Sequence, residues 1–117
     1  MPAIECLIIN DEPIDREIMG NFVKGINFLE TIALCEDAFE ALQILEGNQI
    51  DLLITDIQMP KINGLELVRS LPSPPVIIFV TAHDQFAVNS FELGVADYLL
   101  KPVTFERFLK AINKAKL

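Results

Sequence analysis

Polar residues end several apolar runs in this sequence, and their types suit the chemistry of phosphate and of divalent metals. Asp11 and Asp56 each follow a short apolar run, and Thr81 and Lys101 follow two later runs in the same way. Clustered carboxylates repel one another, and a cation such as Mg²⁺ relieves that repulsion through oxygen ligands. An ammonium and a hydroxyl suit phosphate oxygens, and a carboxylate can itself be a nucleophile that forms an aspartyl phosphate. These residues therefore predict a cation and phosphoryl site, if the fold brings them together.

The remaining inventory excludes other common catalytic sets. The chain has one histidine, His83, and two cysteines, Cys6 and Cys35, which lie in separate apolar runs. They cannot supply a Ser-His-Asp, Cys-His or zinc-ligand spacing. Two cysteines within apolar runs favour buried, reduced thiols, which fits a cytoplasmic location.

Composition limits the class of protein further. The chain has 117 residues, is 51% hydrophobic and carries a net charge of −8. This length suits a single domain, residues 1–117. The acidic balance disfavours direct contact with nucleic acid or an anionic membrane. No apolar run approaches the ~20 residues of a membrane span, and the N-terminus lacks the pattern of a signal peptide.

Short apolar runs alternate with amphipathic stretches along the whole chain. The runs predict five strands, at residues 6–9, 28–34, 52–54, 76–80 and 97–100. The stretches predict five helices, which begin at Pro13, after Asp37, near Gly64, near Asp84 and after Thr104. This alternation predicts an α/β fold, a doubly wound five-stranded parallel sheet covered by helices on both faces. In the strand order 2-1-3-4-5, the polar strand ends converge on one edge, where ligands of such sheets bind.

Helical spacing also predicts which side chains are buried. The first helix has one apolar face, formed by Ile14, Ile18, Met19, Phe22 and Val23. Asp37 and Glu40 have the spacing of a capping box at the start of the second helix. In the helix of residues 84–93, spacing places Phe91 in the core and leaves Phe86 as a candidate contact for a partner.

Four segments, each at the end of a predicted strand, resemble the motifs of bacterial response-regulator receiver domains. They are Asn10-Asp11-Glu12-Pro13, Asp56-Ile57-Gln58-Met59-Pro60 with Asn63-Gly64, Thr81-Ala82, and Asp97-Tyr98-Leu99-Leu100-Lys101-Pro102. The resemblance covers almost the whole chain and is greatest to the receivers of LytTR-type regulators. It implies a flavodoxin-like receiver fold for residues 1–117, with no output domain in this chain. Whether a C-terminal DNA-binding domain was excised, or the receiver stands alone, stays open.

The resemblance implies a phosphoacceptor and a metal site. Asp56 would accept a phosphoryl group from a sensor histidine kinase. The carboxylates of Asp11 and Asp56 and the backbone carbonyl of Gln58 would bind Mg²⁺ (or Mn²⁺). Asn10 stands where the family usually has an aspartate, and its amide would reach the metal only through a water. We therefore expect weaker Mg²⁺ binding, partly offset by Glu12.

The resemblance also implies a switch. Thr81 and Lys101 would sense the phosphoryl oxygens, and a cis peptide bond before Pro102 would aim the lysine into the site. Tyr98 would move inward when Thr81 is drawn to the phosphate; the alternative is a half-buried aromatic residue with its hydroxyl at the surface. The surface of the fourth helix, fifth strand and fifth helix would then change and could form a homodimer that controls an output such as transcription.

The resemblance further implies that Gln58 and His83 would tune the lifetime of the acyl phosphate, although His83 could equally be an ordinary loop residue.

Rival functions are less well supported. An aspartyl phosphatase needs a second aspartate where Gln58 stands, and an FMN carrier needs a Ser/Thr/Gly-rich loop after the first strand. A phosphorylation-independent pseudo-receiver, acting as an interaction module, is favoured only by Asn10, because the acceptor, hydroxyl and ammonium are all present. In either case the domain would be a signalling module and not an enzyme acting on external substrates.

Overall fold

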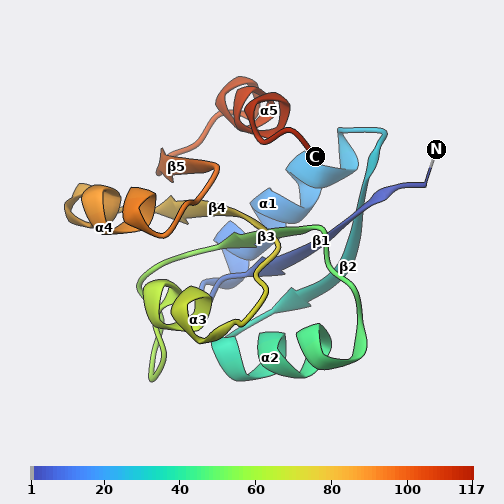
Figure 1. The fold of residues 1–117 in the computed structure, drawn as a ribbon. Helices are drawn as coiled ribbons and strands as arrows, with labels where there is room; N and C mark the ends of the chain where they lie inside the picture. Colours follow the sequence, from blue (N-terminus) through green and yellow to red (C-terminus); the bar gives the residue numbers. More distant parts are fainter. Residues whose placement is uncertain (1) are drawn as a thin grey trace.

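Five parallel strands form one sheet in the computed structural model, which describes residues 2–117 (Figure 1). The strands are β1 (Ile4–Ile9), β2 (Leu29–Cys35), β3 (Leu52–Thr55), β4 (Val76–Thr81) and β5 (Asp97–Leu100). Their order is β2-β1-β3-β4-β5, which confirms the predicted topology. The sequence placed every strand within about two residues of its observed bounds, and β1, β3 and β4 are largely buried apolar runs followed by polar residues.

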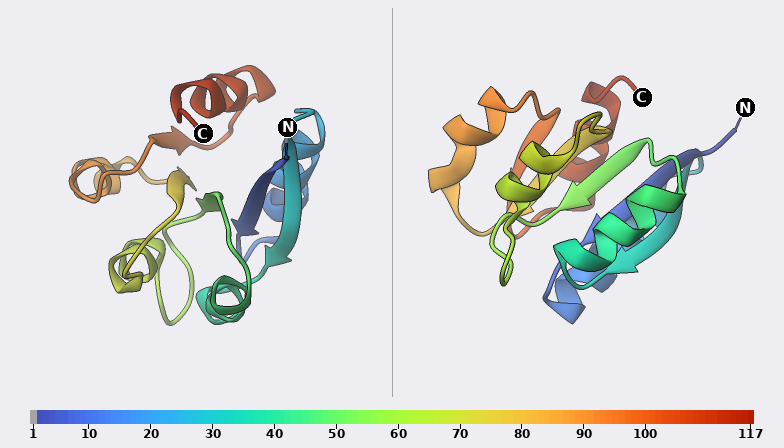
Figure 2. Two further views of the ribbon diagram at one scale, coloured as in Figure 1. Left: turned by 45° about the vertical axis from the view of Figure 1, so that its right-hand side comes forward. Right: turned by 60° about the horizontal axis from the view of Figure 1, so that its bottom comes forward.

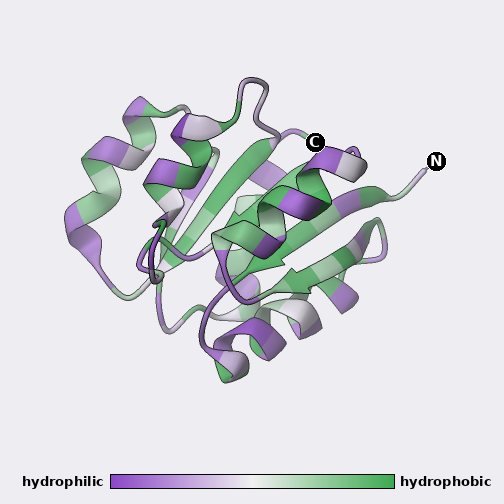
Figure 3. Ribbon diagram, turned by 90° about the horizontal axis from the view of Figure 1, so that it is seen from below, coloured by the Kyte–Doolittle hydropathy of each residue, from purple (hydrophilic) through white to green (hydrophobic). Residues whose placement is uncertain are grey.

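Helices cover both faces of the sheet, as Figures 1 and 2 show. They are α1 (Pro13–Lys24), α2 (Ala38–Gly47), α3 (Gly64–Ser70), α4 (Ala87–Glu92) and α5 (Phe105–Lys114), with a short 3-10 helix, η1 (Asp84–Phe86), before α4. α1 and α5 lie on one face, and α2 and α3 lie on the other. Figure 3 shows that the strands are mostly hydrophobic, whereas hydrophilic and hydrophobic residues alternate along the helices.

Strand alternation divides the interior into two apolar layers. In β1, Cys6 and Ile8 pack on the α1 and α5 side, whereas Leu7 and Ile9 pack on the α2 and α3 side. Cys35 lies in the second layer, and both thiols are free and buried. Burial disfavours the thiolate and raises the pKa of Cys6 to about 12 and that of Cys35 to about 11. The expected buried, reduced thiols are confirmed.

An ion pair between a buried carboxylate and a partly exposed guanidinium joins α5 to the sheet. The carboxylate of Asp97, 3% exposed at the start of β5, accepts hydrogen bonds of 2.9 and 3.0 Å from the Arg107 guanidinium. The ammonium of Lys114 lies further away, at 3.6 Å. Burial alone would raise the pKa of Asp97, but the guanidinium and the backbone N–H of Tyr98 outweigh it and hold that pKa below its ordinary value.

Two predictions of helix faces were wrong. Ile14 is 70% exposed and Ile18 is 39% exposed, whereas the buried residues of α1 are Met19, Gly20 and Val23. Phe91 is 53% exposed, whereas Phe86 packs against the core. The 3-10 helix before α4 has about three residues per turn, so a single α-helical period cannot be continued through it.

The cap of α2 differs from expectation as well. The Asp37 carboxylate accepts a hydrogen bond from the backbone N–H of Glu40, but the Glu40 side chain accepts from Glu36 instead of returning to Asp37. Asp37 is therefore a simple N-cap. The complete capping box is formed by Asn63 and Glu66, at the start of α3.

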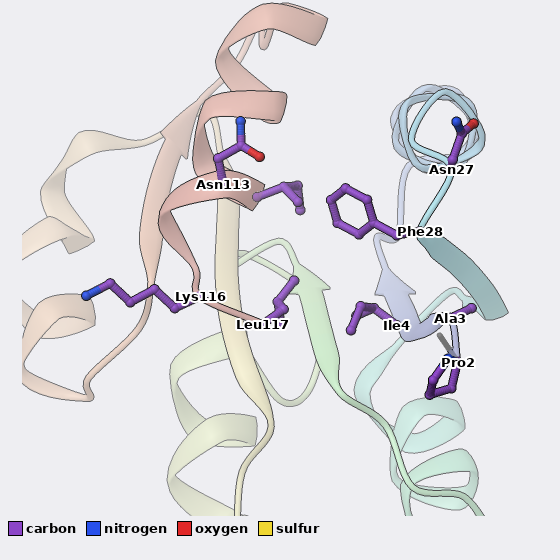
Figure 4. Close-up of a pocket in the computed structure, with 9 residues that line it drawn as sticks. Pro2, Ala3, Ile4, Asn27, Phe28, Asn113, Lys116 and Leu117 are labelled. Atoms are coloured by element: carbon purple, nitrogen blue, oxygen red, sulfur yellow. The ribbon is translucent and has the colours of Figure 1, made fainter.

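The amino-terminal edge of the sheet holds a separate groove of about 340 Å³. The apolar side chains of Ile4, Phe28 and Leu117 line it, with Asn113 at one wall (Figure 4). This groove lies at the end of the strands opposite the predicted site. Among residues 2–117, no helix is long and apolar enough to cross a membrane.

Candidate functional site

The strand register brings the predicted residues to one edge of the sheet. Ile9 of β1 is paired with Thr55 of β3, and the backbone N–H of Asp56 donates to the Ile9 carbonyl at 3.1 Å. Asn10 and Asp56 therefore begin their loops side by side. On the next strands, the backbone N–H of Lys101 donates to the carbonyl of Thr81 at 2.8 Å, so the two leave the sheet together.

Asp56 is the central buried carboxylate of this edge, at 6% exposure. Its Oδ1 accepts hydrogen bonds from the backbone N–H groups of Ile57 and Gln58, at 2.6 and 3.3 Å. Its Oδ2 accepts from the Lys101 ammonium at 2.7 Å. These three donors fix the orientation of the carboxylate and leave about one lone pair, on Oδ2, to accept a further group.

Lys101 has a second carboxylate partner that the sequence analysis did not identify. Its ammonium donates to Oδ2 of Asp15 at 2.8 Å as well as to Asp56. Burial alone would lower the pKa of Lys101, but the hydrogen bonds to Asp15 and Asp56 outweigh it and raise that pKa. The Lys101–Pro102 peptide bond is cis, the form that the resemblance implies.

The expected metal ligands are few but chemically suitable. Asp11 and Gln58 line an open hollow of about 440 Å³ beside Asp56. In the part of the chain that the structure describes, no three His, Cys, Asp or Glu side chains are grouped to hold a metal, and Glu12 does not complete such a group. Mg²⁺ is commonly held through one or two carboxylates and several waters, so the two carboxylates and one carbonyl fit a largely hydrated Mg²⁺.

Asn10 shapes the loop that carries Asp11. It is 2% exposed, and its Oδ1 accepts a hydrogen bond of 2.9 Å from the backbone N–H of Glu12. Its backbone carbonyl accepts from the guanidinium of Arg16 at 2.6 Å, a contact that the sequence analysis did not foresee. The amide therefore orders the turn after β1 and adds no charge beside Asp11.

A chain of hydrogen bonds joins Thr81 to Tyr98 through the backbone of His83. The buried Thr81 hydroxyl oxygen accepts from the His83 N–H at 3.3 Å, and the Tyr98 hydroxyl donates to the His83 carbonyl. The Tyr98 ring also lies 6.5 Å from the exposed ring of Phe91. Burial raises the pKa of Tyr98, because it disfavours the phenolate. His83 thus contributes two backbone groups here, and its imidazole makes an edge contact with Phe86.

Comparison with known proteins identifies the family. The model of the response regulator receiver domain matches residues 6–113. The chain belongs to this family. The receiver domain is 40% identical over 116 residues to the transcriptional regulatory protein LytR of Staphylococcus aureus and 38% identical over 115 residues to the transcriptional regulatory protein BtsR of Salmonella typhi. Each match covers 97% of this chain but only 47% or 48% of the relative, so the chain spans about half the length of these curated relatives.

Solved structures agree with the sequence relatives. The response regulatory domain of protein mrkE from Klebsiella pneumoniae superposes with a TM-score of 0.88 at 27% identity, covering 96% of this receiver domain and 94% of that chain. A receiver domain protein from Clostridium thermocellum gives 0.80 at 32% identity, covering 95% and 92%. Both the expected family and the expected fold of this two-component signalling domain are confirmed.

Proposed function

We propose that Asp56 accepts a phosphoryl group from a sensor histidine kinase, with Mg²⁺ (or Mn²⁺) bound beside it. The observation that supports this best is the ion pair between the buried Asp56 carboxylate and the Lys101 ammonium, 2.7 Å apart at the ligand-binding edge of the sheet. Asp11 and the carbonyl of Gln58 would complete the metal site with Asp56.

Phosphoryl transfer at this site needs alignment and neutralised charge more than acid–base chemistry. An Asp56 carboxylate oxygen attacks phosphorus, and the bond from phosphorus to the kinase histidine nitrogen breaks, with its electron pair left on the imidazole. Mg²⁺ supplies positive charge to the phosphoryl oxygens when it is bound. Lys101 adds a second positive charge, and the Thr81 hydroxyl can donate its proton to a phosphoryl oxygen.

The Thr81–His83–Tyr98 contacts support a conformational readout. If the Thr81 hydroxyl turns to the phosphoryl group, its contact with the His83 N–H is lost, and the loop that holds the Tyr98 hydroxyl must adjust. Tyr98 and Phe91 then carry the change to the exposed surface of α4, β5 and α5. Val88, Phe91 and Leu100 are apolar and at least 49% exposed on α4 and β5, which suits a homodimer contact.

We propose that residues 1–117 act as the cytoplasmic receiver of a longer transcription regulator, whose remaining part would contact DNA. The transcriptional names of the relatives and the net charge of −8 support this division of labour. The alternative is an interaction module that works without phosphorylation, and its one supporting feature is the uncharged Asn10. The affinity for Mg²⁺ separates the two proposals.

The decisive experiment treats the protein with acetyl phosphate and Mg²⁺ and measures the intact mass. We expect one hydroxylamine-labile phosphoryl adduct, lost in Asp56→Ala and blocked by chelation of Mg²⁺. Asp51→Ala is a matched control, because Asp51 lies at the opposite end of β3 and its carboxylate contacts the Glu5 backbone N–H. No adduct, or a stable adduct on another residue, would contradict the proposal.

A further inference from the structure

Lys101 lies between two carboxylates that come from different elements. Its ammonium is 2.7 Å from Oδ2 of Asp56 and 2.8 Å from Oδ2 of Asp15, in the first turn of α1. The three side chains carry a combined charge of −1. Asp56 is only 8% exposed as a side chain and Asp15 is 35% exposed, so the ammonium joins a buried carboxylate to one at the rim of the site.

We propose that Asp15 is a positioning residue that competes with the phosphoryl group for Lys101 and thereby limits how strongly Asp56 holds a phosphoryl group. This inference rests on the proposed function, because it concerns the same acceptor. In the unphosphorylated domain, the Lys101 ammonium donates to Asp15 and Asp56 at once. In the phosphorylated domain, Asp15 retains part of the attraction that the phosphoryl oxygens would otherwise receive.

The charge balance sets the direction of the effect. Phosphorylation replaces a carboxylate of charge −1 with an acyl phosphate of about −2. With Asp15 present, the cluster changes from −1 to about −2; with a neutral residue there, it changes from 0 to about −1. Asp15 and the phosphoryl group would share one ammonium, and the attraction of a unit charge to that ammonium, at about 4 Å in a water-accessible site, alters an equilibrium by about fivefold.

The charge pattern of the loop agrees with this role. Asn10 is neutral and its oxygen is engaged by the Glu12 N–H, so it offers no carboxylate to Lys101. The second acid that Lys101 contacts, Asp15, is supplied by α1.

Matched variants separate this role from a general effect of charge. Asp15→Asn removes the charge with almost no change of volume, and Asp15→Glu keeps it. Glu17→Gln makes the same change of charge two residues further along α1, on an exposed side chain that lines a different hollow, with Asn21 and Lys24. Lys101→Gln removes the ammonium through which Asp15 is proposed to act.

The test measures the affinity for beryllofluoride, which mimics the phosphoryl group on a carboxylate, by amide NMR titration in Mg²⁺. We expect Asp15→Asn to bind about fivefold more tightly than wild type, and Asp15→Glu and Glu17→Gln to stay within about twofold. In the Lys101→Gln background, Asp15→Asn should change the affinity by less than about twofold. High salt should reduce the Asp15→Asn effect, since Asp15 is partly exposed.

An unchanged beryllofluoride affinity in Asp15→Asn would overturn the inference. It would also be overturned if Asp15→Asn changed the affinity by the same factor in the Lys101→Gln background, or if Glu17→Gln changed the affinity as much as Asp15→Asn does. These results differ from a failure of the proposed function. In that case wild type itself would bind no beryllofluoride, and its spectra would match those of Asp56→Ala throughout the titration.

Discussion

Gly64, the first residue of α3, lies directly against the backbone of Asp56. A Cβ atom at Gly64 would be 2.5 Å from the carbonyl oxygen of Asp56 and 3.0 Å from the Cα of Ile57, and the Gly64 N–H already donates to the Ile57 carbonyl at 2.7 Å. The acceptor loop is therefore held by a contact that only glycine allows. The reason is close approach of two backbones.

Gly64→Ala should displace the acceptor loop. We expect a loss of about 1–3 kcal/mol in the free energy of urea unfolding and slower labelling by acetyl phosphate, because backbone atoms must move to accept the methyl group. Gly47→Ala is the control, since a Cβ there meets nothing within 4 Å; it should be neutral or stabilise by up to about 1 kcal/mol. Equal behaviour of the two variants would contradict the packing argument.

Tyr98 can be observed directly, because it is the one tyrosine among 117 residues and the chain has no tryptophan. Burial raises its pKa, so tyrosinate absorbance should appear above pH 10 in the folded domain and near 10 in urea. Unfolding then releases protons at high pH, so the stability contributed by Tyr98 is full below about pH 10 and is lost as the pH rises beyond it. Tyr98→Phe should remove this loss, and an unshifted titration in the folded domain would refute the prediction.

The Asp97–Arg107 pair should contribute to stability in a pH-dependent way. Arg107→Ala leaves the buried Asp97 carboxylate with only the more distant Lys114 ammonium as a cationic partner, and we expect a loss of about 2–3 kcal/mol at neutral pH. Lys114→Ala should cost less than about 1 kcal/mol, since that ammonium is 3.6 Å away and its side chain is 59% exposed.

Acid unfolding provides the second readout of this pair. The pKa of Asp97 is lowered in the folded state, so its stabilisation is present above the unfolded value of about 3.9 and is lost as the pH falls through the folded pKa. In Arg107→Ala, the free energy of unfolding should therefore fall less steeply as the pH is lowered through the acid range. Identical pH profiles for wild type and Arg107→Ala would show that the guanidinium does not set this pKa.

Asn10→Asp should tighten Mg²⁺ binding. An aspartate can accept the same hydrogen bond from the Glu12 N–H, so the turn is preserved while one negative charge is added beside Asp11. We expect the Mg²⁺ affinity, measured by titration, to rise about fivefold or more for a unit charge close to the cation. Equal affinities of the two proteins would show that position 10 does not affect the metal.

The strands and their polar ends could be predicted, because apolar runs followed by Asp56, Thr81 and Lys101 are local features of the sequence. The strand order is not local, and it came with the doubly wound receiver fold. The buried face of η1 and α4 could not be predicted, because the 3-10 helix η1 changes the angle between the side chains of Phe86 and Phe91 from that of a continuous α-helix. Nor could the contact between Asp15 and Lys101, because it joins residues 86 positions apart whose meeting depends on how α1 crosses the sheet. Motifs locate the site, but its electrostatic neighbours follow from the packing of the helices.

The two buried thiols also make the domain convenient for labelling. Cys6 is fully buried, Cys35 is 2% exposed, and burial keeps both in the thiol form, so neither offers a reactive thiolate to a maleimide at neutral pH. A cysteine introduced at the exposed Asn89 of α4 would then react alone. A dye attached there could follow the movement of α4 in an otherwise native chain, without a cysteine-free background that would leave cavities in both layers of the core.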